Sequence, residues 1–412
     1  MPTRTDAAAA VETATPERSR AITLLACAAF SGAAAFRVCD PQLPQLAGQF
    51  ATSTDDAALT VTSFSLAYGA LQLIYGPFGD RYGKFRVVAM ATCACTVASV
   101  GCAFADSLQS IVFFRGIAGA AAAPIVPMSM AWIGDAVAYG ERQIWLARFL
   151  TGTILGRAFG QLIGGFAADI LGWRSAFAVL AAIYLAVGAL LIRELRRTRL
   201  DRAQDVHLAS EQASSVWSRQ RAVLVERWPR FILAIVCAEG AVVFGSLAFV
   251  PTFLHSRFAV SLTAAGAIAG AYALGGLAYT FLARRLVAIL GEASLAVAGG
   301  VTLCFAFGLF AVAPSWYVGL LASVTTGLGF YMLHSVLQTH ATQMAPAARG
   351  TAVSLFSAAL FVGQSGGVAV AGALVDLTGI AFLFGASAVA LPILAFIFSR
   401  ALKSCRTHAH FV

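Results

Sequence analysis

Apolar runs of membrane-spanning length are the feature that most constrains this chain. A helix needs about 20 consecutive apolar residues to cross the hydrocarbon core of a bilayer. Counting at that length predicts twelve spans, at residues 21–40, 58–78, 86–105, 109–133, 145–168, 175–193, 230–254, 263–283, 293–312, 316–341, 351–374 and 379–400. Charged residues make up 11% of the chain, against roughly 25% in soluble domains. The sequence therefore predicts an all-α membrane protein.

Arginine and lysine are concentrated in alternate loops between these spans. The basic loops and the final tail hold Arg81, Lys84, Arg86, Arg142, Arg148, Arg284, Arg285, Arg349, Lys403 and Arg406. The opposite loops hold Asp55, Asp56, Asp106, Asp169 and Asp376, with Arg174 and Arg257 as exceptions. Because cytoplasmic loops are enriched in basic residues, we expect both termini in the cytoplasm. The same bias accounts for the net charge of +9 without a nucleic-acid partner.

One long polar segment divides the chain. Residues 194–229 mix arginines with acids and are expected to be a cytoplasmic linker, with or without a surface helix. The linker separates residues 21–193 from residues 230–400, so each side holds six predicted spans. Residues 1–20 are expected to be a disordered cytoplasmic tail, and residues 401–412 a second cytoplasmic tail. The apolar run from Ile22 could also mimic a secretory signal, but apolar character continues to Val38, which favours a retained first span.

The two sides repeat each other at a constant offset. Asp169-Ile170-Leu171-Gly172 recurs as Asp376-Leu377-Thr378-Gly379, and 376 − 169 = 207. The same offset relates Arg142 to Arg349 and Pro44 to Pro251. A shared offset at three loop ends predicts two homologous six-helix bundles, the internal repeat that many secondary transporters contain.

Residues 76–86 place one carboxylate, three cations and three glycines between two apolar runs. Such a stretch is expected to be a tight loop at the membrane surface. It resembles the signature loop of the major facilitator superfamily, glycine-x-leucine-alanine-aspartate-arginine-x-glycine-arginine. Phe78 stands where leucine is usual. The positions that match, or supply the next basic residue, are Gly76, Asp80, Arg81, Gly83 and Lys84. The resemblance implies two six-helix bundles and a gating role for this loop.

Two further motifs resemble that family. Arg115, with Gly119 four residues on, resembles its span-four motif arginine-x-x-glutamine-glycine, with Ala118 in place of glutamine. The alternative for Arg115 is a structural arginine bound to backbone carbonyls. Residues 156–165 resemble the span-five motif of proton-coupled drug antiporters, in which Gln161 replaces the usual proline. The glycines of that motif predict close helix packing.

Several polar residues within the spans are candidates for function. Arg37 and Asp40 end span one, are three residues apart, and are expected to pair. At 1.5 Å per residue Arg37 lies about 24 Å into a ~30 Å layer, so an interfacial, structural role is also open. Glu239 lies near the middle of span seven, where a lone carboxylate favours its neutral form and becomes a candidate proton carrier. An arginine, Arg115 or Arg157, is expected to respond to its charge.

The remaining candidates would line a cavity between the bundles. Tyr331, His334 and Gln338 share one face of span ten. The cavity candidates are therefore Arg37, Arg157, Gln161, Tyr331, His334 and Gln338, and the coupling candidates are Glu239, Asp40 and Arg115. His334 could equally be a hydrogen-bonded structural group.

No phosphate-binding loop, Ser/His/Asp order or metal-ligand spacing occurs, so we predict neither an enzyme nor a cofactor or metal. We expect a monomeric, proton-coupled exporter of small organic molecules in a bacterial inner membrane. The alternatives are an importer of a small carboxylate or sugar-like metabolite, and, in a different class, a membrane sensor or scaffold. The number of charges within the spans argues against the sensor.

Overall fold

The computed structural model describes residues 16–137, 139–198, 216–345 and 349–409, and this part of the chain is helical without strands. Its first half contains α1 (Pro16–Arg37), η1 (Asp40–Gln42), α2 (Leu43–Gln49), α3 (Thr54–Gln72), α4 (Tyr75–Tyr82), α5 (Lys84–Ala103), α6 (Leu108–Ala122), α7 (Ile125–Ala136), α8 (Tyr139–Phe166), η2 (Ala167–Leu171) and α9 (Trp173–Thr198). Its second half contains α10 (Val216–Val225), α11 (Arg227–Leu247), α12 (Val250–Phe258), α13 (Leu262–Gly270), α14 (Tyr272–Val312), α15 (Trp316–Gln343), α16 (Arg349–Thr378) and α17 (Ile380–Ala409).

Ten helical stretches of the described chain are long and apolar enough to cross a membrane. One of them, Leu262–Val312, has 51 residues and turns at Gly291, where φ is 69° and ψ is 165°. Glycine adopts that backbone conformation readily, whereas other residues are strained in it. Because the helix is interrupted at this turn, the stretch supplies two passes. The α3 helix is not among the ten, because it carries Asp55, Asp56 and several hydroxyl side chains. Counting α3 and the turn at Gly291, the structure is consistent with twelve passes.

Three prolines lie at the start of short helices, and two of them fall within predicted spans. Pro44 and Pro251, which the 207-residue offset relates, each lie in the first turn of a short helix, α2 and α12. Pro124 separates α6 from α7. Proline lacks a backbone donor and is best tolerated in the first turn of a helix, which fits the start of a new helix at each of these positions. The continuous spans expected at 109–133 and 230–254 are therefore each two helices.

Two other expectations at the helix ends were wrong. The N-terminal tail was expected to reach residue 20, but α1 begins at Pro16 with Glu17 in its first turn, a favourable start for a helix. The stretch at 76–86 was expected to be a loop. Instead α4 runs through it to Tyr82, and Gly83, with φ at 88°, makes the turn into α5. Residues 1–15 and 199–215, and the end of the second tail, lie outside the described residues, whereas α10 forms a helix within the predicted linker.

Apolar side chains gather into two clusters. One is built mainly from α1 to α9 and the other from α10 to α17. Glycines bring the backbones close within each half. A methyl group on Gly160 of α8 would lie 2.2 Å from the Ala34 carbonyl oxygen of α1. A methyl group on Gly363 of α16 would lie 2.0 Å from the Cys237 carbonyl oxygen of α11. The glycine motifs therefore act in packing, as the sequence predicted.

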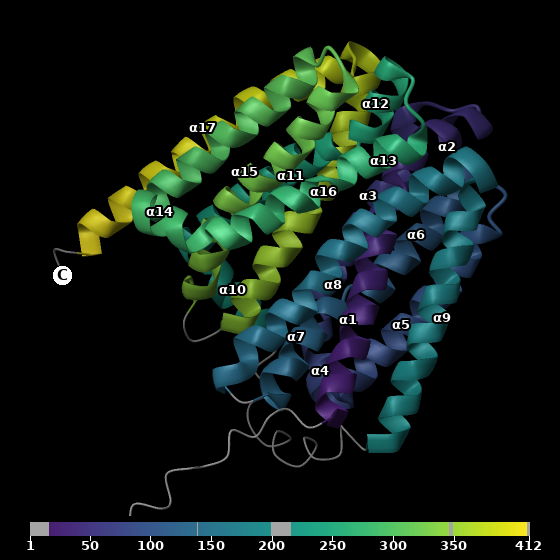
Figure 1. The fold of residues 1–412 in the computed structure, drawn as a ribbon. Helices are drawn as coiled ribbons and strands as arrows, with labels where there is room; N and C mark the ends of the chain where they lie inside the picture. The colour runs from purple at the N-terminus through teal and green to yellow at the C-terminus, as the bar shows by residue number, and fades with distance from the viewer. Residues whose placement is uncertain (1–15, 138, 199–215, 346–348, 410–412) are drawn as a thin grey trace, which may run out of the picture.

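The two halves meet along two helix pairs, α3 with α16 and α8 with α13. We call the end of the molecule that carries Asp55, Asp169 and Asp376 the aspartate end, and the opposite end the arginine end. At the aspartate end α2, α12 and α13 lie together (Figure 1). At the arginine end, α7 and the lower end of α14 stand well apart (Figure 1). The halves thus approach each other at the aspartate end. Toward the arginine end α7 and α14 lie apart, whereas Gln220 of α10 donates to the Leu73 carbonyl of the first half at 3.1 Å.

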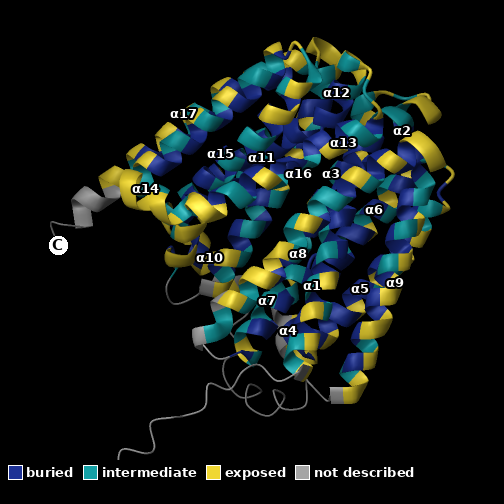
Figure 2. Cartoon of the chain, viewed as in Figure 1, coloured by how far each residue is buried: buried dark blue, intermediate teal, exposed yellow. Residues whose placement is uncertain are grey.

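The outer surface of the helices is apolar. Phe281 is 84% exposed, and Val97 of α5 is 70% exposed. Exposed and buried positions alternate along the outward faces of α9 and α17 (Figure 2). Such surfaces suit a lipid environment, in which the driving force for packing comes from close contacts and polar groups. The protein is a multi-pass membrane protein.

Candidate functional site

A buried polar cluster lies where α1 ends. Asp40, fully buried, accepts a hydrogen bond from the Arg37 guanidinium at 3.1 Å and from the Gln161 amide of α8 at 2.9 Å. The predicted Arg37–Asp40 pair is therefore present. Arg37 is 4% exposed, so protein encloses the pair. Helix α1 ends at Arg37 and η1 begins at Asp40. The Asp40 carboxylate faces α8. The second carboxylate oxygen has no hydrogen-bond partner among the described residues.

Arg115 is held by the backbone. Its guanidinium donates to the carbonyl oxygens of Ala35 at 2.7 Å and Thr60 at 3.0 Å, and it lies 4.2 Å from the centre of the Phe64 ring. Carbonyl dipoles and an aromatic face stabilise a cation without a carboxylate. This is the structural alternative that the sequence left open for Arg115.

Arg37 also reaches across to the second half. Its guanidinium lies 4.8 Å from the centre of the Phe244 ring of α11. The two residues are related by the internal offset, since 244 − 37 = 207. The Phe244 ring packs against Phe330 of α15 at 5.0 Å. Equivalent positions of the two halves thus meet at the interface between them.

A second buried carboxylate lies in the other half. Glu239 of α11 is fully buried and hydrogen-bonds to Nδ1 of His334 of α15 at 2.8 Å. The hydrogen-bond partner of Glu239 is therefore His334, and the described arginines form no ion pair with this carboxylate. His334 also stacks on Phe330, with ring centres 4.7 Å apart. The second oxygen of Glu239 has no partner among the described residues.

The other cavity candidates lie near the same interface. Tyr331 packs against Tyr272 of α14, with ring centres 6.1 Å apart. Exposure increases along α15 from the partly buried Tyr331 and His334 to the exposed Gln338. Arg157 of α8 is partly exposed and lies within electrostatic range of Tyr272. Phe330 thus packs against both Tyr331 and His334, whereas Gln338 lies one turn further toward the arginine end.

The signature segment lies at the arginine end, away from this cluster. Lys84 forms an ion pair with Asp135 at the end of α7. Arg81 stacks on its neighbour Tyr82. Gly79 packs tightly against Met128, since a methyl group there would lie 2.3 Å from the sulfur atom. The side chain of Asp80 lies outside the described part.

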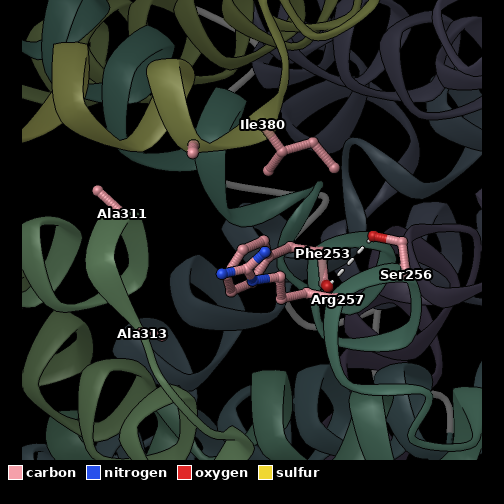
Figure 3. Close-up of a pocket in the computed structure, with 7 residues that line it drawn as sticks. Phe253, Ser256, Arg257, Ala311, Ala313 and Ile380 are labelled. Carbon is pink, nitrogen blue, oxygen red and sulfur yellow. Dashed lines mark hydrogen bonds between the residues drawn. The ribbon is translucent and has the colours of Figure 1, made fainter.

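A surface pocket of about 350 Å³ opens at the aspartate end of the second half. Its lining includes Phe253, Arg257 and Ile380, and the Ser256 hydroxyl donates to the Phe253 carbonyl at 3.3 Å (Figure 3). None of the candidate residues from the sequence lines this pocket. Within the described residues no group of three or more His, Cys, Asp or Glu side chains could hold a metal ion.

Sequence reasoning missed the aromatic side chains between the two carboxylates. Phe244, Phe330 and Tyr272 connect the Arg37–Asp40 cluster to the Glu239–His334 pair. Phenylalanine is common in membrane helices and carries no signal of its own. The 207-residue offset from Arg37 to Phe244 was the one available clue.

These features define a polytopic helical membrane protein with buried polar residues between two halves. A sequence model of the Major Facilitator Superfamily matches residues 25–262, more than half of the chain. The chain therefore belongs to the Major Facilitator Superfamily of transporters.

Individual proteins named as transporters or exporters also match this chain. The uncharacterized MFS-type transporter YceJ of Bacillus subtilis is 28% identical over 347 residues, covering 82% of this chain and 85% of the relative. The multidrug export protein EmrB of Haemophilus influenzae is 30% identical over 145 residues, covering 35% of this chain and 28% of the relative. The nucleoside transporter NupG shares the fold, with a TM-score of 0.76 and 15% identity over 94% of this chain and 99% of that structure.

Proposed function

We propose that this transporter exports small organic molecules across a bacterial inner membrane, using the proton gradient, with the substrate carried between the two halves. It would act as a monomer that moves its substrate unchanged. The observation that carries the proposal is the buried Glu239–His334 pair. Intramembrane ionisable residues are costly and mark proton or substrate pathways. The partial match to the multidrug exporter EmrB supports the export direction.

The pair is suited to binding and releasing a proton. A hydrogen bond between a carboxylate and a protonated imidazole is strengthened by opposite charges, so adding a proton to Glu239 weakens it. His334 stacks on Phe330, and Phe330 packs on Phe244, which contacts Arg37 of the other half. A movement of His334 would therefore displace Phe330 and, through it, Phe244. Protonation would in this way bias the packing between the halves.

Alternating access follows from the same arrangement. The halves meet at the aspartate end through α8 and α13, and α7 and α14 lie apart at the arginine end. On the proposed orientation, with the arginine end in the cytoplasm, this is the inward-facing state. Rocking of the halves about the central aromatic contacts would open the aspartate end. The Lys84–Asp135 pair lies at the end where the outward-facing state must close.

Glu239→Gln tests the coupling role. We would reconstitute both proteins in proteoliposomes and impose a pH gradient, with ethidium, benzoate, indole-3-acetate and uridine as probes. We expect the wild type to accumulate at least one probe against its concentration gradient, in the direction of export. The variant, which mimics the protonated acid, should lose gradient-driven accumulation and keep energy-independent counterflow of the same probe.

The chain offers a matched control. Glu292 lies 3.4 Å from His340, so it forms a second glutamate–histidine pair, but its side chain is 31% exposed. Glu292→Gln should leave gradient-driven accumulation unchanged. Accumulation by Glu239→Gln with the normal pH dependence would remove Glu239 from the coupling mechanism. Accumulation in the opposite direction would establish an importer instead.

A further inference from the structure

We infer that the substrates are small organic carboxylates with an aromatic or apolar body, and that Arg157 and the Tyr272 hydroxyl bind the carboxylate between the two halves. The inference rests on the proposed function, because it names the class of molecule that the transport site would carry. It is argued from the charges in the central layer, from the position of Arg157, and from an unsatisfied buried hydroxyl.

The central layer has an excess of positive charge. The guanidiniums of Arg37, Arg115 and Arg157 outnumber the carboxylates of Asp40 and Glu239, and a proton on either His334 or Glu239 adds to this excess. Arg37 pairs with Asp40 at 3.1 Å, and Glu239 pairs with a histidine. Arg115 donates to two carbonyl oxygens and lies over an aromatic ring, and its Nη2 has no hydrogen-bond partner among the described residues. For Arg157 the described residues supply neither an ion pair nor a hydrogen bond. A charge at this depth is expensive unless a partner or water meets it.

Arg157 stands at the interface between the halves. The adjacent residue, Ala158, packs against Gly270 of α13, and Gln161 lies one turn further along the same helix. Arg157 is within electrostatic range of Tyr68 of the first half and Tyr272 of the second. Its equivalent under the internal offset is neutral, since 157 + 207 = 364 and residue 364 is glutamine. Arg157 therefore places a positive charge on the first-half side of the interface, within electrostatic range of tyrosines from both halves.

Tyr272 supplies the second contact. It is 7% exposed, and its hydroxyl has no hydrogen-bond partner among the described residues. A buried polar group without a partner is destabilising. A carboxylate that accepts from both this hydroxyl and the Arg157 guanidinium would satisfy the two groups together.

The surroundings of Tyr272 favour an aromatic or apolar substrate body. Its ring packs against Phe244, Phe330 and Tyr331. Small-molecule sites combine such apolar walls with a few polar groups that fix the orientation of the ligand. An aromatic acid would match both features, whereas an organic cation would meet repulsion from Arg157.

The test is binding to the purified protein, without a gradient. Thermal unfolding would be followed with matched acids and amides: benzoate and benzamide, cinnamate and cinnamamide, indole-3-acetate and indole-3-acetamide. We expect at least one acid to raise the wild-type Tm saturably, and its amide to have little effect. Arg157→Gln should weaken the apparent affinity for that acid about tenfold or more, as expected for a lost charged hydrogen bond. Arg157→Lys should retain part of the affinity.

Two further variants make the result specific. Tyr272→Phe keeps the ring and removes only the hydroxyl, so it should weaken acid binding about threefold or more even if Arg157→Gln cannot be purified. Arg148→Gln, on the same helix near the arginine end, where the side chain stacks on Trp145, should bind as the wild type does.

Several outcomes would overturn the inference: stabilisation of the wild type by none of the acids, equal stabilisation by acids and amides, or unchanged binding in both Arg157→Gln and Tyr272→Phe. Because the assay requires neither a gradient nor a direction of transport, these outcomes would leave the proposed proton-coupled export standing. Retained gradient-driven accumulation in Glu239→Gln, which would overturn the coupling role, would likewise leave acid binding standing.

Discussion

At the scale of single residues, the protein stabilises each membrane-embedded charge differently. Asp40 has a guanidinium and an amide, Glu239 has a histidine, and Arg115 has carbonyl oxygens. Arg115 is the clearest structural case, because it joins the backbones of α1 and α3 to α6 and is 1% exposed. A buried guanidinium with good hydrogen bonds holds these helices in register, even where it adds little net stability.

Arg115→Met tests this structural role. The substitution leaves the carbonyl oxygens of Ala35 and Thr60 without their donor, and hydrogen bonds to charged groups contribute about 1.5–3 kcal/mol each. We expect Tm in detergent to fall by several degrees and the yield of monodisperse protein to drop. Arg148→Met, which removes an exposed arginine, is the control and should change neither. A variant with wild-type stability would show that the carbonyl contacts of Arg115 contribute little.

At the scale of elements, one helix end fastens the two halves together. The Asp169 carboxylate accepts from the backbone amides of Leu262 at 3.0 Å and Thr263 at 2.6 Å, and from the Thr263 hydroxyl at 2.6 Å. It therefore caps the first turn of α13 from the opposite half, where the helix dipole also favours a negative charge. Asp376, its equivalent under the internal offset, lies within electrostatic range of Asp55, a like charge. One of the two related contacts is thus attractive, and the other repulsive.

Asp169→Ala should loosen the closed aspartate end. Losing a helix cap costs about 0.5–2 kcal/mol, which is roughly two- to thirtyfold in the equilibrium between closed and open ends. Spin labels at the exposed positions Leu171 and Arg257 would report the separation of the halves, and a population at longer distance should grow. Asp56→Ala is the control, because that carboxylate bonds to Thr52 in its own half. Identical distance distributions for Asp169→Ala and the wild type would contradict the capping role.

At the scale of the whole molecule, the aspartate end and the arginine end differ both in how the halves pack and in which charged residues they carry. The halves pack together near the aspartates, and α7 and α14 lie apart near the arginines. Between these ends, α3 meets α16 through polar contacts, including Gln364 to Ser65 at 3.3 Å and Ser365 to the Thr62 carbonyl at 3.0 Å. Polar contacts between helices permit movement more readily than a large apolar interface does. The same helix pair also packs through Tyr68 and Phe361, with ring centres 4.7 Å apart.

The orientation of this axis in the membrane is a prediction from the arginine bias. Reporter fusions after Val225 and at Val412 should both show cytoplasmic activity. A fusion after Phe104, between α5 and α6, should report the opposite side and serves as the control. A reporter signal from the opposite side at either Val225 or Val412 would contradict the twelve-pass arrangement.

The sequence by itself determined the helical membrane architecture. The length of each apolar segment and the arginines in the loops beside it are local properties, and they act on each span separately. It also predicted the Arg37–Asp40 pair, since three residues of spacing limit where those side chains can reach. The glycine motifs of α8 and α16 predicted close packing, because only glycine admits backbones at such short distances.

Only the tertiary structure decided which charge meets which partner. Glu239 and His334 are 95 residues apart, and no spacing rule relates them. Arg115 finds carbonyls instead of a carboxylate because α1 and α3 present their backbones to it. Phe244 contacts Arg37 because the halves close at one end. These contacts depend on helix rotation and on the relative tilt of the two halves, which are set by packing among many helices and leave no periodic signal in the chain.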